Sequence, residues 1–324
     1  MPLRQRALPA HDARAEAVSP AALSQHWDAE ALRQRLLPLL AGLSVEVLAQ
    51  CESTNTLLIE RARSGDGALV PCMLVAEQQT RGRGRLGRTW VSAAGASLTF
   101  SLALPLAPRD WSGLSLAVGL ALAEALDPAP AGEAGGAPSR PAPRIVLKWP
   151  NDLWLADATQ AEGVGRKLGG VLVETLSAGT QRLCIVGVGL NVLPLPPASR
   201  TADAAGMASG YGCLQQVLPG AHPPQVLAVI AAPLVRALLA FEQDGFAPLA
   251  AAYGARDLLR GRAVTTSLPE WAAGVAEGVD ESGALMLHAG GRRHRIVSGE
   301  VSVQPAERVA ERPAPQGTAS AGSA

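Results

Sequence analysis

Eight consecutive residues, Arg81–Arg88, hold four arginines and three glycines and are called the arginine loop here. Glycine lets a backbone approach a ligand closely, and arginine offers a planar, permanently charged fork that suits phosphate and carboxylate oxygens. The loop follows an apolar segment, residues 74–76, that we expect to be a buried strand. A flexible basic loop on a rigid strand predicts a lid over a phosphorylated ligand.

Two other interpretations of the arginine loop stay open at this point. Such a loop is also typical of a solvated basic segment in an arginine-rich chain, or of an RNA-binding segment. It is neither a Walker loop nor a dinucleotide fingerprint, because no Lys-Ser/Thr pair follows the glycines and no helix is expected there. The 28 basic and 28 acidic residues give a formal net charge of zero, which argues against nucleic-acid and membrane-surface partners.

Three further segments place lysine, glycine, amide and carboxylate groups where strands are expected to begin or end. They are Lys148-Trp-Pro-Asn-Asp152, Lys167-Leu-Gly-Gly170 and Gly187-Val-Gly-Leu-Asn191. Glycine inside a strand allows a ligand or a neighbouring backbone to come close. Each segment alone also has a structural explanation, since Pro-Asn-Asp, for example, is ordinary turn chemistry.

The hydrophobic periodicity predicts the elements that position these segments. Helices are expected over residues 28–40, 54–63, 111–126, 226–241 and 246–259. Strands are expected over residues 44–50, 68–76, 97–106, 144–149, 167–176 and 182–188, with a loop at 77–95 and a hairpin turn at 177–180. Short strands over residues 263–266, 271–279, 284–288 and 293–297 predict a compact β-barrel appended to an α+β domain.

The composition also bears on compartment and metal binding. No apolar run reaches the roughly 18–20 residues that span a bilayer, and residues 1–26 lack the apolar core of a secretory signal. The four cysteines are scattered and the five histidines show no ligand spacing, so we expect no protein metal site and no disulfide framework. These features predict a cytoplasmic protein without a membrane partner.

Taken in order, the motifs closely resemble those of the biotin–protein ligases, from about residue 45 to the end of the chain. The matching segments are residues 53–55, 77–90, 148–152, 167–170 and 187–191, and residues 299–303 resemble the last strand of the family's C-terminal domain. The resemblance implies a mixed or antiparallel sheet with helices, the class II synthetase-like biotin/lipoate ligase catalytic domain, plus a small SH3-like β-barrel. The expected parts are a partly disordered N-terminal extension at 1–44, the catalytic domain at 45–259, the C-terminal domain at 260–306 and a disordered tail at 307–324.

The resemblance also implies a two-step reaction. Biotin and MgATP give biotinyl-5′-adenylate and pyrophosphate. A lysine of a carrier domain, typically the biotin carboxyl carrier of acetyl-CoA carboxylase, then attacks the acyl carbon. No cysteine or serine nucleophile is needed, because the adenylate is itself the activated acyl group.

The family's binding residues carry over by position. Polar residues before the arginine loop match the contacts to the biotin head, the loop matches the cover over biotin and adenylate, and later glycines match backbone contacts. Trp90 is expected beneath the loop, with the protein core as the alternative. By resemblance, the binding residues are Ser53, Thr54, Asn55, Gln79, Arg83, Gly84, Arg85, Trp90, Lys167, Gly169, Gly170, Gly187, Gly189 and Asn191.

The residues expected to act on the reacting groups are Lys167, Arg85, Asp152 and Lys148. Lys167 matches the lysine that contacts the carboxylate and the α-phosphate, where an ammonium stabilises developing charge. Asp152 either orients the incoming lysine or helps to bind Mg²⁺, and its alternative is a turn-forming role. Lys148 is expected to face the phosphates, with a structural ion pair as its alternative.

Three rival functions remain for comparison. A lipoate–protein ligase shares the superfamily and chemistry but takes another acid, a nucleic-acid-binding protein would use the arginine loop, and a catalytically dead scaffold would only bind. Some family members carry an N-terminal winged helix of about 60 residues that represses genes, but about 44 residues precede the catalytic region here. We therefore expect a ligase without DNA binding, leave homodimerisation open, and assign no function to the insertions at 127–143 and 197–224.

Overall fold

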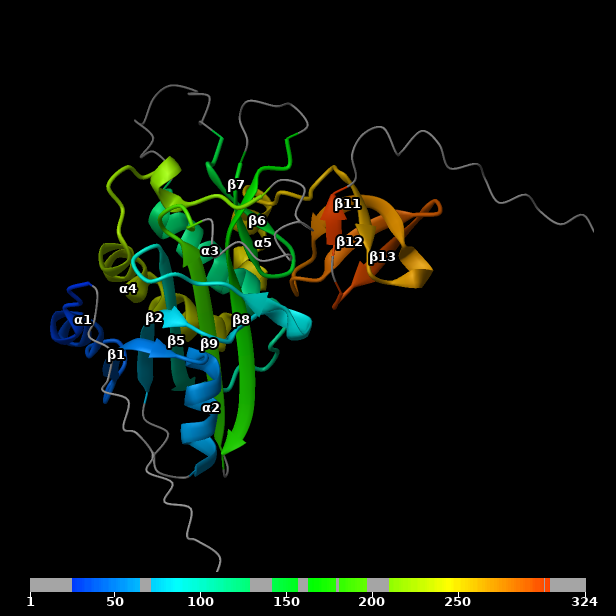
Figure 1. Cartoon of the computed structure of the whole chain (residues 1–324). Helices are drawn as coiled ribbons and strands as arrows, with labels where there is room; N and C mark the ends of the chain where they lie inside the picture. The colour runs from blue at the N-terminus through cyan, green and yellow to red at the C-terminus, as the bar shows by residue number, and fades with distance from the viewer. Residues whose placement is uncertain are drawn as a thin grey trace, which may run out of the picture.

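The computed structural model describes residues 25–64, 71–128, 142–156, 163–178, 181–196, 210–299 and 301–303. Within these ranges a large sheet with helices is followed by a small sheet that lies to its side (Figure 1). The predicted disorder of residues 1–24 and of the tail falls outside the described residues, as do the interiors of both insertions. The predicted lack of a DNA-binding domain therefore stays a prediction.

The large sheet has seven strands in the order β1-β2-β5-β9-β8-β7-β6. β1 and β2 are parallel, and every other neighbouring pair is antiparallel, which confirms the predicted mixed α+β fold. β5 is buried on both faces along nearly its whole length because it lies inside the sheet with helices on either side. The bounds are β1 (Ser44–Cys51), β2 (Cys72–Gln79), β5 (Ser97–Pro105), β6 (Ile145–Lys148), β7 (Asp152–Leu155), β8 (Arg166–Ala178) and β9 (Gln181–Asn191).

Helices cover both faces of this sheet. On one face, α2 (Thr54–Ser64) packs Leu58 against Leu74 and Ile185. On the other face, α3 (Leu114–Leu126) and α4 (Pro223–Asp244) share the main core, and α1 (Ala29–Leu36) lies against β1 and α4. Among the described helices α4 alone is long and apolar enough to cross a bilayer, but it packs on α3 and β5 inside the protein.

Several predicted bounds were wrong for identifiable reasons. α3 begins at Leu114 and not at residue 111, because Gly113 adopts a left-handed conformation (φ 81°) that ends the preceding loop. The predicted helix at 246–259 is instead a 3₁₀ turn followed by α5 (Ala250–Gly254), after which the chain turns to run beside β6. The expected loop at 77–95 contains a hairpin of β3 (Gly82–Arg83) and β4 (Thr89–Trp90).

The C-terminal sheet has five strands in the order β13-β12-β11-β10-β14, all paired antiparallel. This confirms the predicted small β domain, whose apolar side chains include Val264, Leu285 and Leu287. A turn at Asp280–Gly283 joins two of its strands and faces the catalytic domain. The bounds are β10 (Ala263–Thr266), β11 (Ala273–Val279), β12 (Leu285–Ala289), β13 (Arg292–Ile296) and β14 (Val301–Val303).

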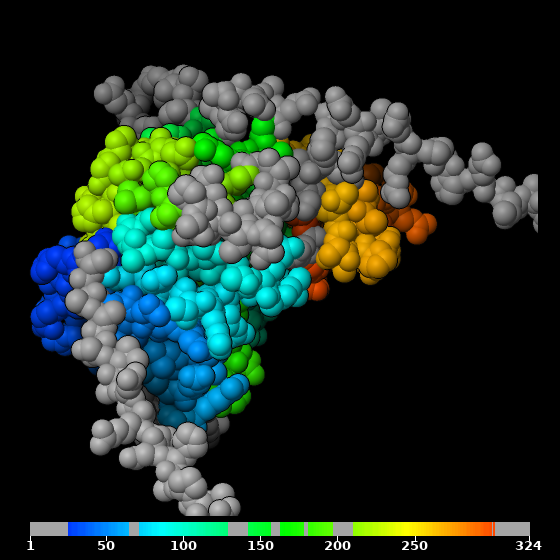
Figure 2. Space-filling view, viewed as in Figure 1, coloured from blue at the N-terminus to red at the C-terminus, as the bar shows by residue number. Residues whose placement is uncertain are grey.

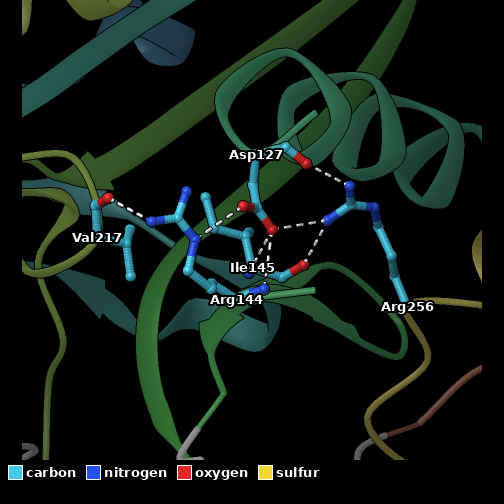
Figure 3. A network of polar contacts seen from close by, with 5 residues as sticks. All are labelled: Asp127, Arg144, Ile145, Val217 and Arg256. Atoms are coloured by element: carbon cyan, nitrogen blue, oxygen red, sulfur yellow. Dashed lines mark hydrogen bonds and ion pairs between the residues drawn. The ribbon is translucent and has the colours of Figure 1, made fainter. Parts of the chain in front are cut away.

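An ionic network around Asp127 holds the start of β6, the strand that leads into Lys148-Trp-Pro (Figure 3). At the end of α3, the Asp127 carboxylate accepts hydrogen bonds from the Arg144 and Ile145 backbones and from the guanidinium groups of Arg144 and Arg256. Burial opposes ionisation of Asp127, but these hydrogen bonds lower its pKa overall. Arg256 is 3% exposed and also donates to the Ile145 carbonyl. Removing Asp127 would leave the buried Arg256 charge without its carboxylate partner, at a cost of about 3–5 kcal/mol.

Candidate active site

A cavity of about 430 Å³ opens between the start of α2, the arginine loop, the β6–β7 turn and the ends of β8 and β9. In the space-filling view the cyan segment that includes the arginine loop lies at the surface, between the blue N-terminal elements and the orange C-terminal sheet (Figure 2). The predicted site residues that line the cavity are Ser53, Thr54, Asn55, Gln79, Arg83, Gly84, Arg85, Trp90, Lys148, Asp152, Lys167, Gly170, Gly187, Gly189 and Asn191.

Gly169 is the predicted site residue that the structure places outside the cavity lining. A Cβ at this position would lie 2.4 Å from the Gly189 carbonyl oxygen and 2.6 Å from Leu190 Cδ2. Glycine is therefore required here by the packing of β8 on β9. Its neighbour Gly170 does line the cavity, beside the Asp152 carboxylate.

One end of the cavity, which we call the amide end, is a closed set of hydrogen bonds around the start of α2. Gln79 Oε1 accepts from the Thr54 backbone nitrogen (2.7 Å) and hydroxyl (3.1 Å). Asn55 Nδ2 donates to Glu174 Oε2 (2.8 Å) and to the Leu172 carbonyl, and its Oδ1 accepts from Ser101 (2.5 Å). Because Thr54, Asn55 and Ser101 are each at most 3% exposed, folding alone fixes these donors and acceptors.

Ser101 and Glu174 are members of this end that the sequence analysis did not identify. Ser97, Thr99 and Ser101 alternate along β5, and all are buried. A period of two in small hydroxyl residues within an apolar strand indicates a polar stripe on one face. That pattern could have identified Ser101 from the sequence. No local pattern shows that Glu174 contacts Asn55 and Arg83.

The arginine loop is an antiparallel hairpin. Gly82 pairs with Trp90, Arg83 pairs with Thr89, and the Gly84 nitrogen donates to the Arg88 carbonyl (2.7 Å). The Arg83 guanidinium reaches back to Glu174 Oε1 (3.1 Å), so the hairpin is tied to the amide end. This contact leaves the Arg83 side chain about half exposed at the mouth of the cavity.

The other end, which we call the lysine end, centres on an ion pair. Lys167 Nζ lies 2.8 Å from Asp152 Oδ1, and both side chains are 16% exposed. Lys148 Nζ lies over the Trp154 ring, 5.2 Å from its centre, and lines the same cavity. The structure thus brings together Lys148, Asp152 and Lys167, which the sequence analysis placed on one expected strand, just beyond its end and at the start of another expected strand.

Two buried polar atoms of residues that line the cavity have no hydrogen-bond partner among the described residues. They are the Trp90 indole nitrogen and the Asn191 Oδ1 atom, and both are buried. The Asn191 amide nitrogen donates to the Gly212 carbonyl (3.3 Å). A buried donor and a buried acceptor that both lack partners cost free energy unless a ligand pairs with them.

Tyr211 lines the lysine end and comes from the insertion to which the sequence analysis gave no role. Its segment pairs with β8, since Tyr211 bridges to Lys167 and the Gly212 nitrogen donates to the Lys167 carbonyl (2.9 Å). The described part of the insertion therefore completes the wall beside Lys167. No group of three metal-binding side chains occurs within the described residues.

Known proteins share the sequence and the fold that form this cavity. The sequence model of the biotin/lipoate A/B protein ligase family matches residues 47–191, and that of the biotin protein ligase C-terminal domain matches residues 261–304. The chain is 33% identical over 282 residues to the bifunctional ligase/repressor BirA of Escherichia coli, which covers 85% of this chain and 78% of BirA.

Two further similarities extend over most of both partners. A biotin–[acetyl-CoA-carboxylase] ligase of Mycobacterium tuberculosis is 34% identical over 289 residues, covering 85% of this chain and 94% of that protein. The structure of a biotin protein ligase from Aquifex aeolicus in complex with biotin and ATP is 26% identical, with a TM-score of 0.58, covering 80% of this chain and 98% of that one. The chain belongs to the biotin/lipoate A/B protein ligase family and, within it, to the biotin–protein ligases.

Proposed function

We propose that the protein activates biotin with ATP as biotinyl-5′-adenylate and then transfers biotin to a lysine of a carrier domain. One observation carries this proposal: a single cavity joins a buried, internally paired amide end to a cationic lysine end. The first suits a neutral polar head, and the second suits a carboxylate and a phosphate. Relatives named as biotin–[acetyl-CoA-carboxylase] ligases, and a similar structure with biotin and ATP, support it.

The amide end would hold the ureido ring of biotin. This ring carries one carbonyl acceptor and two N–H donors, so it needs donors and acceptors at fixed positions. Ser53 and Thr54 offer hydroxyls, and Asn55 offers an amide whose orientation is set by Ser101 and Glu174. Recognition by prearranged hydrogen bonds discriminates strongly against a ligand that lacks the matching groups. Lipoate has no ureido ring, so this end favours biotin over lipoate.

The lysine end would carry out adenylation. A biotin carboxylate oxygen attacks the α-phosphorus of ATP, a phosphorus–oxygen bond forms, and pyrophosphate leaves with the electrons of the broken bond. Lys167 would stabilise the charge that develops on the α-phosphate, and the arginine loop residues Arg83 and Arg85 would cover the mixed anhydride. A carrier amine then attacks the acyl carbon, an amide forms and AMP leaves.

The nucleotide would occupy the region of Trp90, Asn191 and Tyr211. The indole donor and the Asn191 acceptor lack partners among the described atoms, so they offer hydrogen bonds to the nucleotide. Tyr211 offers an aromatic face on which a base can stack. This assignment gives the described part of the second insertion a role in ATP binding.

Mg²⁺ fits the same end of the cavity. Asp152 supplies a carboxylate to the described lining, and Mg²⁺ is usually held by one or two carboxylates together with substrate phosphates. When bound, the ion would neutralise phosphate charge during adenylation. Asp152 has a second role open to it, because a carboxylate beside Lys167 could also orient the carrier lysine.

Carrier, location and assembly are part of the same proposal. The carrier would be the biotin carboxyl carrier domain of an acetyl-CoA carboxylase, as the names of the relatives suggest. A cytoplasmic location fits the free cysteines of the described chain, among which burial raises the pKa of the Cys184 thiol to about 12. Homodimerisation stays a prediction that light scattering in solution would decide.

The decisive experiment is pyrophosphate exchange into ATP with the purified protein. We expect exchange that depends on biotin, followed by a mass increase of one biotinyl group on a recombinant carrier domain. Lipoate replaces biotin in the control reaction. Exchange supported by lipoate and not by biotin would overturn the assignment of the substrate.

A further inference from the structure

The turn at Asp280–Gly283 of the C-terminal sheet contacts the lysine end directly. The Trp149 indole nitrogen donates to the Gly283 carbonyl oxygen (3.0 Å), although the two residues are 134 positions apart. Trp149 is 3% exposed and lines the cavity between Lys148 and Asp152. A tryptophan buried at this depth needs a partner for its N–H, and here the other domain provides it.

Hydrogen bonds within the C-terminal domain fix the shape of the turn independently of Trp149. Asp280 Oδ1 accepts from the Ser282 nitrogen (2.9 Å) and hydroxyl (2.7 Å) and from the Ala284 nitrogen (3.0 Å). Arg295 donates to Asp280 Oδ2 (2.6 Å). Burial opposes ionisation of Asp280, but these hydrogen bonds lower its pKa to about 2. The Gly283 carbonyl is therefore presented by a rigid loop.

The turn also fits closely against the start of α3. Gly283 has φ 82°, and a Cβ there would lie 2.8 Å from Gly113 Cα and 3.0 Å from Leu116 Cδ1. Both backbone conformation and space thus require glycine at this junction. Beside it, Ser115 of α3 donates its hydroxyl hydrogen to the Pro150 carbonyl (3.0 Å).

Electrostatics favour the same docked arrangement. Hydrogen bonds from Ser112 and the nearby charge of Arg295 hold the pKa of Asp110 below its usual value. Asp110 belongs to the loop before α3, and Arg295 belongs to β13. The cation that orders the turn therefore also faces an anion of the catalytic domain.

We propose that Gly283 and Trp149 are positioning residues for adenylation, so that the docked C-terminal domain sets the place of the Lys148–Asp152 segment. The segment is held on one side by α3 through Pro150 and on the other by the turn through Trp149. Both of its charged ends line the lysine end. The inference rests on the proposed function and adds to it two residues that act through the placement of Lys148 and Asp152.

A positioning role differs from a merely structural one in its kinetics. Displacing Lys148 and Asp152 would slow the chemical step but leave the amide end untouched, so kcat should fall while the KM for biotin stays unchanged. A structural role would lower thermal stability and leave kcat per folded molecule unaltered.

The test uses two variants of the full chain, Trp149→Phe and Gly283→Ala. Trp149→Phe keeps an aromatic ring and removes the indole donor together with part of the ring volume, and Gly283→Ala pushes the turn away from α3. We expect each to lower kcat of biotin-dependent pyrophosphate exchange about tenfold or more, because small misplacements of catalytic groups have effects of this size. The KM for biotin should stay within about twofold of the parent value.

Arg293→Gln is the matched control, since Arg293 pairs with Glu277 on the same sheet, is largely exposed and lies outside the turn. It should keep the parent kcat. If Gly283→Ala does not fold, Trp149→Phe decides alone. A parental kcat in Trp149→Phe would overturn the inference. A parent without exchange would refute the proposed function and the positioning role together, whereas an active parent with unaffected variants would refute the positioning role alone.

Discussion

The two ends of the cavity differ in whether their buried polar atoms have hydrogen-bond partners within the protein. At the amide end, Thr54, Asn55 and Ser101 are buried and pair with protein atoms. At the lysine end, the Trp90 nitrogen and Asn191 Oδ1 are buried without partners among the described residues. The arginine loop above them exposes 73% of Leu86 at its tip.

The difference indicates where each ligand interaction is prepared. Donors and acceptors fixed before binding lose little entropy when a ligand arrives, so the amide end should give specificity for the acid. On the proposed function, the lysine end would gain its missing hydrogen bonds only with a nucleotide present. Changes at the amide end should therefore alter binding and stability together, and changes at the lysine end should alter the rate of reaction.

The largest expected effect on stability comes from filling the amide end with Gly187→Ala. A Cβ at Gly187 would lie 2.3 Å from Asn55 Oδ1, and the buried Asn55 cannot move without breaking its hydrogen bonds. We expect a loss of about 1–3 kcal/mol in the free energy of unfolding, as is typical of overpacking. The KM for biotin should rise by roughly tenfold or more, since about 1.4 kcal/mol of lost binding is a factor of ten. Thermal unfolding and exchange kinetics measure both.

Gly84→Ala is the matched control in the arginine loop. Its Cβ would come no nearer than 3.5 Å to another atom, and Gly84 has φ −115°, which any residue adopts. The change in stability should stay within about 0.5 kcal/mol. Equal destabilisation by both substitutions would remove the distinction between a prearranged end and an adaptable one.

A second effect should follow from Lys167→Ala at the lysine end. On its proposed role, losing the ammonium would remove charge stabilisation at the α-phosphate, so we expect adenylate formation to slow about 100-fold in a single turnover. The KM for biotin should change less than the rate, because the amide end is intact and only the contact to the carboxylate is lost. Arg61→Ala, which breaks the half-exposed pair with Glu46 far from the cavity, should leave the rate unchanged. A parental rate in Lys167→Ala would exclude this lysine from the reaction.

The smallest expected effect lies behind the lysine end, at Asp257. Burial raises the pKa of Asp257 to about 6, and its Oδ2 atom has no partner among the described residues. Burial, and then the charges of Asp257 and Asp152, raise the pKa of the neighbouring Tyr253. The unfolded chain loses the Asp257 proton near pH 4, whereas the folded protein keeps it until about pH 6. The free energy of unfolding therefore falls as the pH rises from about 4 to 6 and stays lowered above pH 6.

Asp257→Asn removes this ionisation and can keep the hydrogen bond from the Leu259 nitrogen to Oδ1. We expect it to stabilise the protein by on the order of 1–2 kcal/mol at pH 8 and by much less at pH 4. Thermal melts at the two pH values measure the difference. A gain that is equal at both pH values would show that Asp257 is not ionised at a cost in the folded state.

Much of the site could be predicted because its residues occur in short motifs attached to strands with clear periodicity. Lys148, Lys167 and Gly187 belong to β6, β8 and β9. In the sheet β8 lies next to β9, and β7 lies between β8 and β6. β7 itself was missed, because it has only four residues and directly follows Pro-Asn, which is typical of a turn. Gly169 was matched by resemblance to a backbone position near the ligand, and the sequence alone does not show that it lies outside the cavity lining.

Other parts depended on long-range contacts that no local pattern encodes. Tyr211 follows Asn191 by 20 residues, and its pairing with Lys167 became visible only in three dimensions. The same holds for the bond between Trp149 and Gly283, which lie in different domains. The residue roles within the cavity, and the domain boundaries at residues 45 and 260, stay predictions.

The path of the chain after α5 has a consequence for how the domains can be separated. β6 is the last strand in the order of the seven-stranded sheet, and the segment around Asp257 runs parallel to it. Two hydrogen bonds join them: the Leu147 nitrogen donates to the Arg256 carbonyl (2.8 Å), and the Leu258 nitrogen donates to the Leu147 carbonyl (2.9 Å). The connection between the domains thus covers an open sheet edge, the kind of surface on which strands of other molecules add and aggregate. A catalytic fragment that ends before Arg256 would expose that edge and would lose the ion pair between Arg256 and Asp127. A fragment that ends after Leu259 would keep the edge covered and the ion pair intact.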